Sequence, residues 1–202
     1  MNYNELLLKR FACKSYSSQL LTKEEELSIL EYGRLTPSSF GLEAWHIYSL
    51  SKRTSPEFFD KMFTCCFNQY SVKSAAFITV LTYFKEASFK SDSDFIKSRA
   101  ERFDGGLKAF EEDFRGFYSL IPNVNSWSKA QTYLMGMNMA IGASSIGIES
   151  CILEGFNEEA AAKVLNLDLS QEGIGLVIPF GYPAEGQKGK LRIKLEELVT
   201  QF

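Results

Sequence analysis

Residues 75–84 read AAFITVLTYF, and this stretch does most to decide the fold. It is apolar at nearly every position, whereas a strand with one solvated face alternates apolar and polar residues. We therefore predict a strand that is covered on both faces. Two further stretches, AWHIYSL at 44–50 and GIGLVIPFGY at 173–182, are predicted to be strands as well.

Helices are predicted between and around these strands. Thr22-x-x-Glu25 is a capping box that begins a helix, and Thr36-Pro37 ends it. Other helices are predicted at 3–9, from 55 to about 68, over 94–120 with a break at Gly105-Gly106, over 127–145 and after Asn157. A loop is predicted at 123–126 and a fourth strand at 146–153. The sum is an α+β fold, a small sheet surrounded by helices, in a single domain over residues 1–202.

The predicted helix at 127–145 carries an apolar seam. Its members are spaced alternately by three and four residues, as in a helix packed along another helix: Trp127, Ala130, Leu134, Met137 and Ile141. Small residues beside the seam permit close approach of a neighbouring backbone. This helix is therefore either central in its own subunit or shared with a partner subunit.

The composition argues against several classes of protein. The 22 basic and 25 acidic residues give a net charge of −3, whereas nucleic-acid binders usually carry a basic excess. No apolar stretch long enough for a membrane span is present, and the N-terminus lacks the basic lead-in of a signal peptide, so we expect a cytoplasmic protein. One histidine and four cysteines without a CxxC pair argue against a metal site. Cys65 and Cys66 are interpreted as buried thiols rather than as a redox pair.

Motifs for side-chain catalysis are also missing. His46, the only histidine, lies in a predicted strand and is interpreted as a packed residue, which disfavours a Ser–His hydrolase. The chain has no P-loop and no G-x-G-x-x-G after a strand. We therefore predict no catalytic side chain and expect a bound cofactor to carry any chemistry.

Two basic clusters could hold a phosphorylated cofactor. Lys9, Arg10 and Lys14 follow the first apolar run, and a second cluster lies near the other end of the chain, at Lys188, Lys190 and Arg192. Either cluster alone is also typical of an ordinary solvated surface. Only their convergence on one anion would distinguish the two interpretations.

Five segments together resemble the nitroreductase family of FMN-dependent NAD(P)H oxidoreductases. LKRFACKSY at 8–16 resembles the Arg-x-Ser-x-Lys-x-Phe opening of that family, and TPSSFGLEAWHIY at 36–48 is similar to its APSSxNxQPWxF segment. FNQYSVKSAAFITV at 67–80 has an Asn ahead of a core strand, as in the family. GIESCILEGFNEEAAAKVLNL at 147–167 and VIPFGYP with KGKLRIKLEELV, at 177–183 and 188–199, resemble its last two motifs.

The resemblance implies an FMN site that uses NADH or NADPH as reductant. Arg10, Lys190 and Arg192 would contact the phosphate. Lys14 would lie near flavin N1 and the C2 carbonyl, Asn68 near the pyrimidine edge, and the Glu154-Gly155 turn at N5. The full set of implied FMN-binding residues is Arg10, Phe11, Ala12, Lys14, Pro37, Ser38, Ser39, Gly41, Asn68, Ser71, Glu154, Gly155, Lys190 and Arg192.

The resemblance also implies a nitroreductase-like fold with a mostly antiparallel sheet, in an intertwined homodimer with FMN at the interface. The implied reaction is ping-pong hydride transfer from NAD(P)H to a nitroaromatic, a quinone or a related electrophile. The chain departs from the family pattern at several positions: Ala12 replaces Ser, Gly41 replaces Asn, Glu43 replaces Gln, Ala44 replaces Pro, and Ser71 stands where some members have Lys. The departures at Gly41, Glu43 and Ser71 leave open a flavin-binding protein with little or no turnover. A structural or interaction domain that binds no flavin is the further alternative if both basic clusters merely face water.

Overall fold

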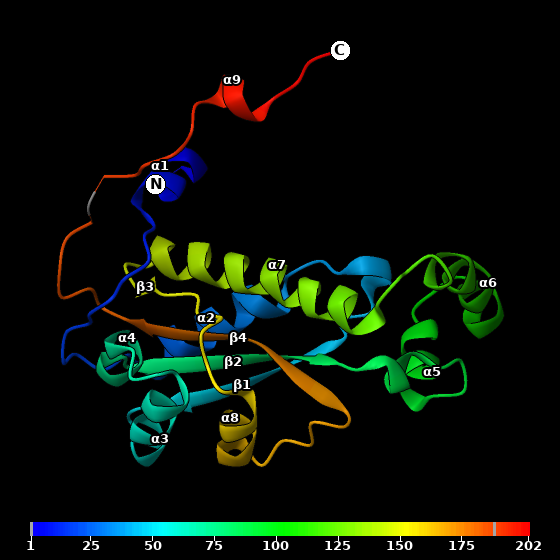
Figure 1. The fold of residues 1–202 in the computed structure, drawn as a ribbon, viewed down its shortest axis with the longest axis horizontal. Helices are drawn as coiled ribbons and strands as arrows, with labels where there is room; N and C mark the ends of the chain where they lie inside the picture. Colours follow the sequence, from blue (N-terminus) through cyan, green and yellow to red (C-terminus); the bar gives the residue numbers. More distant parts are fainter. Residues whose placement is uncertain (1, 188) are drawn as a thin grey trace.

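The centre of the structure is a four-stranded sheet. The computed structural model describes residues 2–187 and 189–202. The strands are β1 (Trp45–Ser51), β2 (Phe77–Phe84), β3 (Glu149–Ser150) and β4 (Glu172–Gly181), in the order β1-β2-β4-β3 (Figure 1). All neighbouring strands are antiparallel, so the predicted α+β class and antiparallel sheet are confirmed.

Strand β2 is covered on both faces, as its sequence predicts. Phe77 and Leu81 pack into one buried cluster, and Ile78 and Val80 pack into another on the opposite face. Successive residues of a strand point to opposite faces, so a strand covered on both sides needs apolar residues at both parities. Each such side chain contributes about 1.5–3 kcal/mol when it is fully buried.

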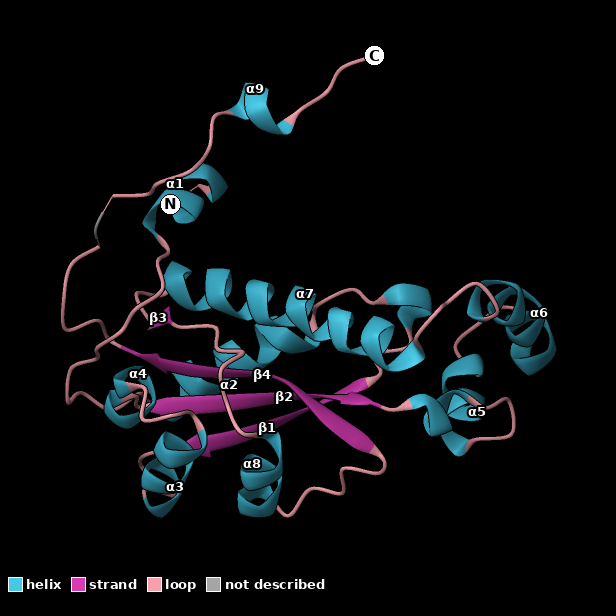
Figure 2. Ribbon diagram, viewed as in Figure 1, coloured by secondary structure: helices cyan, strands magenta, loops and turns pink. Residues whose placement is uncertain are grey.

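Helices form a layer on each face of this sheet (Figure 2). α2 (Lys23–Arg34) and α7 (Val124–Ser145) cover the face that carries Phe77. α3 (Glu57–Cys65), α4 (Tyr70–Ser74) and α8 (Glu158–Leu165) cover the other face. The predicted helix at 55–68 is therefore too long, since it ends at Cys65 and the short helix α4 follows separately.

Local capping explains where several helices begin. The Thr22 hydroxyl accepts a hydrogen bond from the Glu25 amide at 3.2 Å, and the Glu25 carboxylate accepts one from the Thr22 amide at 2.8 Å. The predicted capping box of α2 is thus confirmed. α1 (Tyr3–Lys9) begins with the same arrangement between Asn2 and Glu5.

Helix α7 runs across the sheet and has two different faces. The prediction of a loop at 123–126 is wrong, because the Asn123 side chain accepts from the Ser126 amide at 2.8 Å and caps a helix that begins at Val124. One face packs on the sheet, where a Cβ at Gly136 would lie only 2.7 Å from Leu176 Cδ1. The predicted seam is on the other face, with Leu134 52% and Met137 37% exposed.

The predicted helical region at 94–120 is two helices, α5 (Asp94–Ala100) and α6 (Gly106–Tyr118). The break lies at Gly105 and Gly106, as predicted, and both adopt positive φ angles, 88° and 66°. α5 and α6, with the short 3₁₀ helices η1 (Ser39–Gly41) and η2 (Glu86–Phe89), enclose a third cluster that is rich in phenylalanine.

Two other predictions are corrected. Only Glu149 and Ser150 of the stretch 146–153 form a strand, because residues 146–148 make the turn that leaves α7, in which Gly147 has a positive φ of 85°. His46 lies in β1, but its side chain is exposed rather than packed and its Nδ1 lies 2.9 Å from the Glu172 carboxylate.

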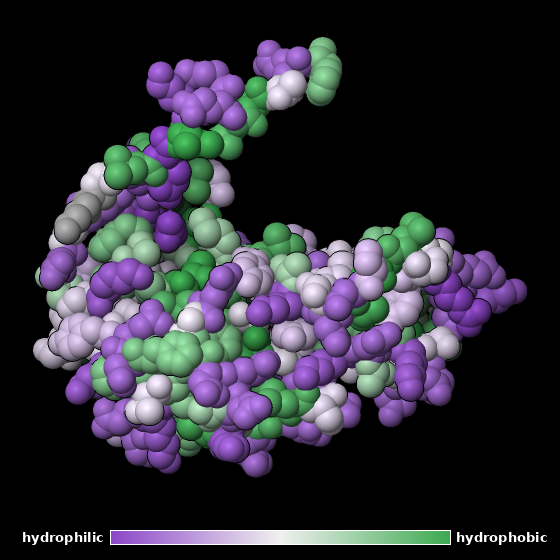
Figure 3. Space-filling view, viewed as in Figure 1, coloured by the Kyte–Doolittle hydropathy of each residue, from purple (hydrophilic) through white to green (hydrophobic). Residues whose placement is uncertain are grey.

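The segment beyond Pro183 extends away from the sheet and passes α1 before the short helix α9 (Leu195–Leu198) (Figure 1). Apolar side chains on this segment are largely exposed, including Leu191 at 90% and Leu195 at 72%. Figure 3 shows an open hollow between this arm and the body of the protein. Among the described residues, no helix combines the length and the apolar character needed to cross a membrane.

Candidate cofactor site

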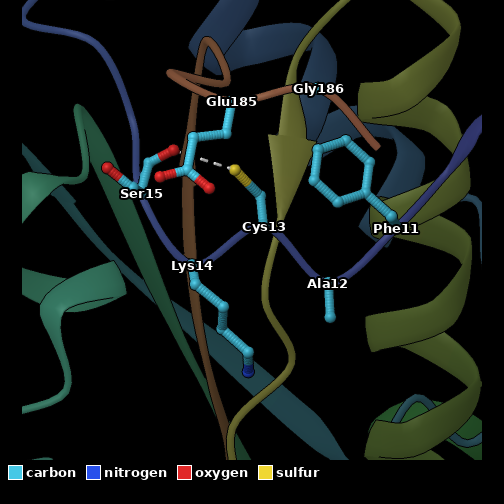
Figure 4. Close-up of a pocket in the computed structure, with 7 residues that line it drawn as sticks. All are labelled: Phe11, Ala12, Cys13, Lys14, Ser15, Glu185 and Gly186. Atoms are coloured by element: carbon cyan, nitrogen blue, oxygen red, sulfur yellow. Dashed lines mark hydrogen bonds between the residues drawn. The ribbon is translucent and has the colours of Figure 1, made fainter. Parts of the chain in front are cut away.

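The segment from Arg10 to Ser15 is extended, so Lys14 does not sit on a helix. Ala12 pairs with Ser150 in a parallel bridge, and the Cys13 amide donates to the Ser150 carbonyl at 3.0 Å. Residues therefore alternate between two sides: Ala12 and Lys14 point one way, while Phe11 and Cys13 lie on the other side with Glu185 (Figure 4). A cavity of about 300 Å³ lies along this segment and is lined by residues 11–15, Glu185 and Gly186.

The two predicted basic clusters meet at this segment. The Lys190 ammonium donates a hydrogen bond to the Arg10 carbonyl. Burial lowers the pKa of Lys190, and the positive charges of Arg10 and Arg192 lower it further. Lys9 contacts the end of α7 by donating to the Ser144 carbonyl at 3.3 Å. Cations from distant parts of the sequence therefore converge, with the Glu149 carboxylate as an acidic neighbour. Lys188 of the same cluster lies outside the described residues.

Lys14 reaches toward the strand region that follows α7. Its ammonium lies 3.1 Å from the Cys151 sulfur, and Cys151 is buried. A thiol is a weak acceptor, so this contact orients the lysine without neutralising its charge. Lys14 thus keeps a cation on the exposed side of the extended segment.

The region around Asn68 and Gly155 borders the same segment. The Gln69 side chain donates to the Gly155 carbonyl at 2.9 Å, and the Tyr16 amide donates to the Ser74 hydroxyl at 3.2 Å. Asn68 is exposed with a positive φ of 57°, whereas Ser71 is buried. Gly155 does not adopt a positive φ, but a Cβ there would lie 3.4 Å from the Gln69 amide nitrogen.

Residues 37–41 are held elsewhere, against the first half of α7. The Ser39 amide donates to Gln131 Oε1 at 3.0 Å, and the Glu43 amide donates to the Ser38 hydroxyl at 2.8 Å. Phe40, Gly41 and Glu43 all have positive φ angles of 48–58°. Such conformations are costly for residues with a side chain and persist where the surroundings hold them. Here the Glu43 carboxylate pairs with Arg102 of the α5–α6 region at 2.9 Å.

One chain therefore does not bring all the predicted residues together. Lys9, beside the basic cluster, contacts Ser144, whereas Ser39 contacts Gln131, thirteen residues earlier in α7. At 1.5 Å per residue these contacts are about 20 Å apart along the helix. Arg10, Phe11, Ala12, Lys14, Asn68, Ser71, Glu154, Gly155, Lys190 and Arg192 lie on connected segments, while Pro37, Ser38, Ser39 and Gly41 lie apart from the basic cluster.

The sequence prediction missed several polar residues in this region. Gln69 holds Gly155, Cys151 contacts Lys14, and the Glu149 carboxylate is buried beside Phe11. Tyr133 of α7 lies beside Glu154, and hydrogen bonding to that carboxylate raises the pKa of Tyr133 to about 12. For Glu149 the sequence did carry a signal: it is an acidic residue inside the apolar stretch SIGIESCIL at 145–153, and buried carboxylates are rare.

The adjacent thiols Cys65 and Cys66 are both buried, as predicted. Burial raises the pKa of Cys66 to about 12, so this thiol stays neutral at physiological pH. The thiolate is the reactive form of cysteine. Neither residue lines the site.

Comparison with known proteins agrees with this fold and these motifs. The sequence matches the Nitroreductase family model over residues 7–182. A Staphylococcus epidermidis protein provisionally named an NAD(P)H nitroreductase is 28% identical, with 95% of this chain and 92% of that protein aligned. A nitroreductase-like protein from Streptococcus mutans superposes with a TM-score of 0.86 at 17% identity, covering 99% and 97% of the two chains. A provisionally named nitroreductase from Exiguobacterium sibiricum, solved in complex with FMN, gives a TM-score of 0.81 at 16% identity and covers 100% and 98%.

Proposed function

Because the chain belongs to the nitroreductase family, we propose that it is an FMN-dependent oxidoreductase. It transfers hydride from NADH or NADPH to a nitroaromatic, a quinone or a related electrophile by a ping-pong mechanism. The observation that carries the proposal is the convergence of Arg10, Lys190 and Arg192: Lys190 bonds to the Arg10 carbonyl, and burial together with the charges of Arg10 and Arg192 lowers the pKa of Lys190.

The residues present fit a phosphate dianion. A cation whose pKa is lowered by burial and by neighbouring positive charges is stabilised by a bound anion. Arginine offers a planar fork of donors that matches phosphate oxygens, and charge-assisted hydrogen bonds of this kind are among the strongest in proteins. Arg10, Lys190 and Arg192 would therefore hold the FMN phosphate.

The flavin ring would lie toward Lys14, Asn68 and Gly155. Bound FMN supplies the redox chemistry, accepting hydride from the nicotinamide and passing it to the acceptor. The chain's own residues bind and orient: the Lys14 ammonium keeps a positive charge on the exposed side of its strand, and Gln69 fixes the Gly155 backbone. A cation close to the ring favours negative charge there, which is one way a protein tunes its cofactor.

A second copy of the chain would complete the site. Residues 37–41 lie about 20 Å along α7 from the basic cluster, so a partner whose α7 runs antiparallel brings its own 37–41 segment near that cluster. The exposed seam on α7 and the apolar arm at 191–199 supply surfaces for such a homodimer. Contiguous exposed apolar surface of this kind marks an interface.

The homodimer is tested by placing charge on the seam. A Leu134→Arg, Met137→Arg variant is expected to elute as a 22.9 kDa monomer and to lose FMN, whereas the parent chain elutes at twice that mass. Leu120→Arg is a matched control, because Leu120 is 76% exposed and lies in the loop after α6, outside the residues of the seam. A double variant that remains a dimer with full FMN would contradict the proposed interface.

The flavin and its turnover are tested separately. The purified protein is expected to be yellow and to bleach when NADH or NADPH is added anaerobically. An Arg10→Ala, Arg192→Ala variant is expected to be colourless, and stoichiometric FMN in that variant would refute the phosphate assignment. Colour without bleaching would instead support a flavin-binding protein with little turnover. The Glu43 carboxylate, which is paired with Arg102 in place of a neutral amide, favours that second candidate.

A further inference from the structure

Glu149 is a buried carboxylate beside the basic cluster. It lies in β3 and is only 2% exposed. One carboxylate oxygen accepts from the Ser144 hydroxyl at 2.9 Å and the other from the Phe11 amide at 3.3 Å. The side chain therefore ties the end of α7 to the residue that follows Arg10.

The charged groups around Glu149 come from three parts of the chain. Lys9 at the end of α1 and Arg10 in the extended segment both lower its pKa, and the Lys190 ammonium of the C-terminal arm also faces it. Its two oxygens nevertheless bond to neutral donors, and burial raises the pKa of Glu149 above its ordinary value despite the cations. Cys13 and Tyr16 are the other titratable groups that face it, and burial raises the pKa of both, so they stay neutral.

We propose that Glu149 is the internal counter-ion of the basic cluster and takes up one proton when a phosphate dianion binds there. This inference rests on the proposed FMN site. Without a ligand, the Glu149 carboxylate offsets the repulsion among Lys9, Arg10 and Lys190. A bound dianion takes over that role and leaves Glu149 as a second, desolvated negative charge close to the first.

Protonation resolves this conflict at little structural cost. A like charge nearby favours the neutral form of a carboxyl group. The neutral acid keeps one oxygen as acceptor for the Phe11 amide and donates its new O–H to the Ser144 hydroxyl. The proton comes from solvent, so FMN binding and pH are linked: affinity falls as pH rises from the pKa of free Glu149 to its pKa in the complex.

The test measures proton uptake on FMN binding to the flavin-free full-length protein. Titration calorimetry is run from pH 5.5 to 8.5 in two buffers of different ionisation enthalpy, on the parent chain and on Glu149→Gln. The glutamine preserves shape, because its oxygen accepts from the Phe11 amide and its nitrogen donates to the Ser144 hydroxyl. Glu31→Gln, on the exposed surface of α2, is the matched control for the loss of one negative charge.

A rise of about 1 in the Glu149 pKa on binding gives about half a proton of extra uptake in the parent at the optimal pH. It also makes Glu149→Gln bind FMN about tenfold more tightly than the parent at the alkaline end of the range. Free FMN contributes the same phosphate ionisation to all three titrations. In the complex the phosphate and Glu149 titrate as a coupled pair, so an infrared measurement identifies which of the two carries the proton. Riboflavin, which lacks the phosphate, is expected to bind the parent and Glu149→Gln with equal affinity.

Equal proton uptake and parallel affinity profiles for the parent and Glu149→Gln would overturn the inference, as would an equal effect of the variant on riboflavin. Failure of all three proteins to bind FMN would overturn the proposed function instead. An infrared difference spectrum of the parent alone gives an independent readout, because the inference requires a new carboxylic-acid C=O band when FMN binds. Absence of that band would refute the proposal even if the variant does not fold.

Discussion

The contact between α2 and α7 positions the helix that carries the seam, and Gly142 is a point of close packing in that contact. A Cβ at Gly142 would overlap the ring of Tyr32, near the ring atom that joins the side-chain stem. The Tyr32 backbone is fixed in turn, because its carbonyl accepts from the Asn138 side chain at 2.6 Å. The ring therefore has little freedom to withdraw.

We predict that Gly142→Ala destabilises the protein. Alanine gains about 1 kcal/mol over glycine inside a helix, but overpacking of a close contact costs about 1–3 kcal/mol. The overlap with a fixed ring places this case toward the upper part of that range, so the net loss is about 1–2 kcal/mol. Gly116→Ala in α6 is the matched control: no atom lies within 4 Å of its added Cβ, so it is expected to stabilise by about 0.5–1 kcal/mol.

Urea unfolding at one fixed protomer concentration measures both changes, since the stability of the proposed dimer would depend on concentration. The two variants are expected to differ by about 1.5–3 kcal/mol at equal m-values, from the overpacking and propensity terms above. A Gly142→Ala protein as stable as Gly116→Ala would show that α2 and α7 can separate freely, which would refute the reasoning.

Three further outcomes are expected. The native protein should react slowly with iodoacetamide at pH 8, because all four cysteines are buried and burial raises the pKa of Cys66 to about 12. Unfolding should expose four reactive thiols, and rapid labelling of the native protein would contradict the structure. Glu26→Ala should lower the unfolding free energy by about 1–3 kcal/mol, because the buried carboxylate accepts from the Ser51 hydroxyl at 2.5 Å and pairs with Arg53 at 3.0 Å. An unchanged urea midpoint would contradict this prediction. Asn123→Ala should lower the unfolding free energy by about 1 kcal/mol, because it removes the N-cap of α7, whereas Asn123→Asp retains the cap. Equal losses of stability in the two variants would argue against capping.

Much of the fold follows from local patterns. The stretch 75–84 is apolar at both parities, and such a strand has few alternatives to a position between two layers of helices. The capping box at Thr22 and the glycine pair at 105–106 act through neighbouring residues, so the sequence shows them directly.

The errors arise where a tertiary contact decides between equal local signals. Asn123 is as typical of a loop as of a helix N-cap, so the start of α7 was misplaced. The stretch 146–153 is apolar throughout most of its length, but only Glu149 and Ser150 form a strand. The site shows the same limit. Motif order predicted that Pro37 to Gly41 and Arg10 belong to one kind of site, but the sequence carries no signal for their separation along α7.

The bond between Lys190 and the Arg10 carbonyl joins positions 180 residues apart. During synthesis, the first half of the basic cluster leaves the ribosome long before the second half exists. The nascent chain thus cannot hold a phosphate through both halves until all four strands, the last of which ends at Gly181, have been translated. Under the proposed phosphate assignment, capture of the cofactor becomes a late event in biogenesis, and a prematurely terminated chain that lacks the arm has lost Lys190 and Arg192 from the phosphate contacts.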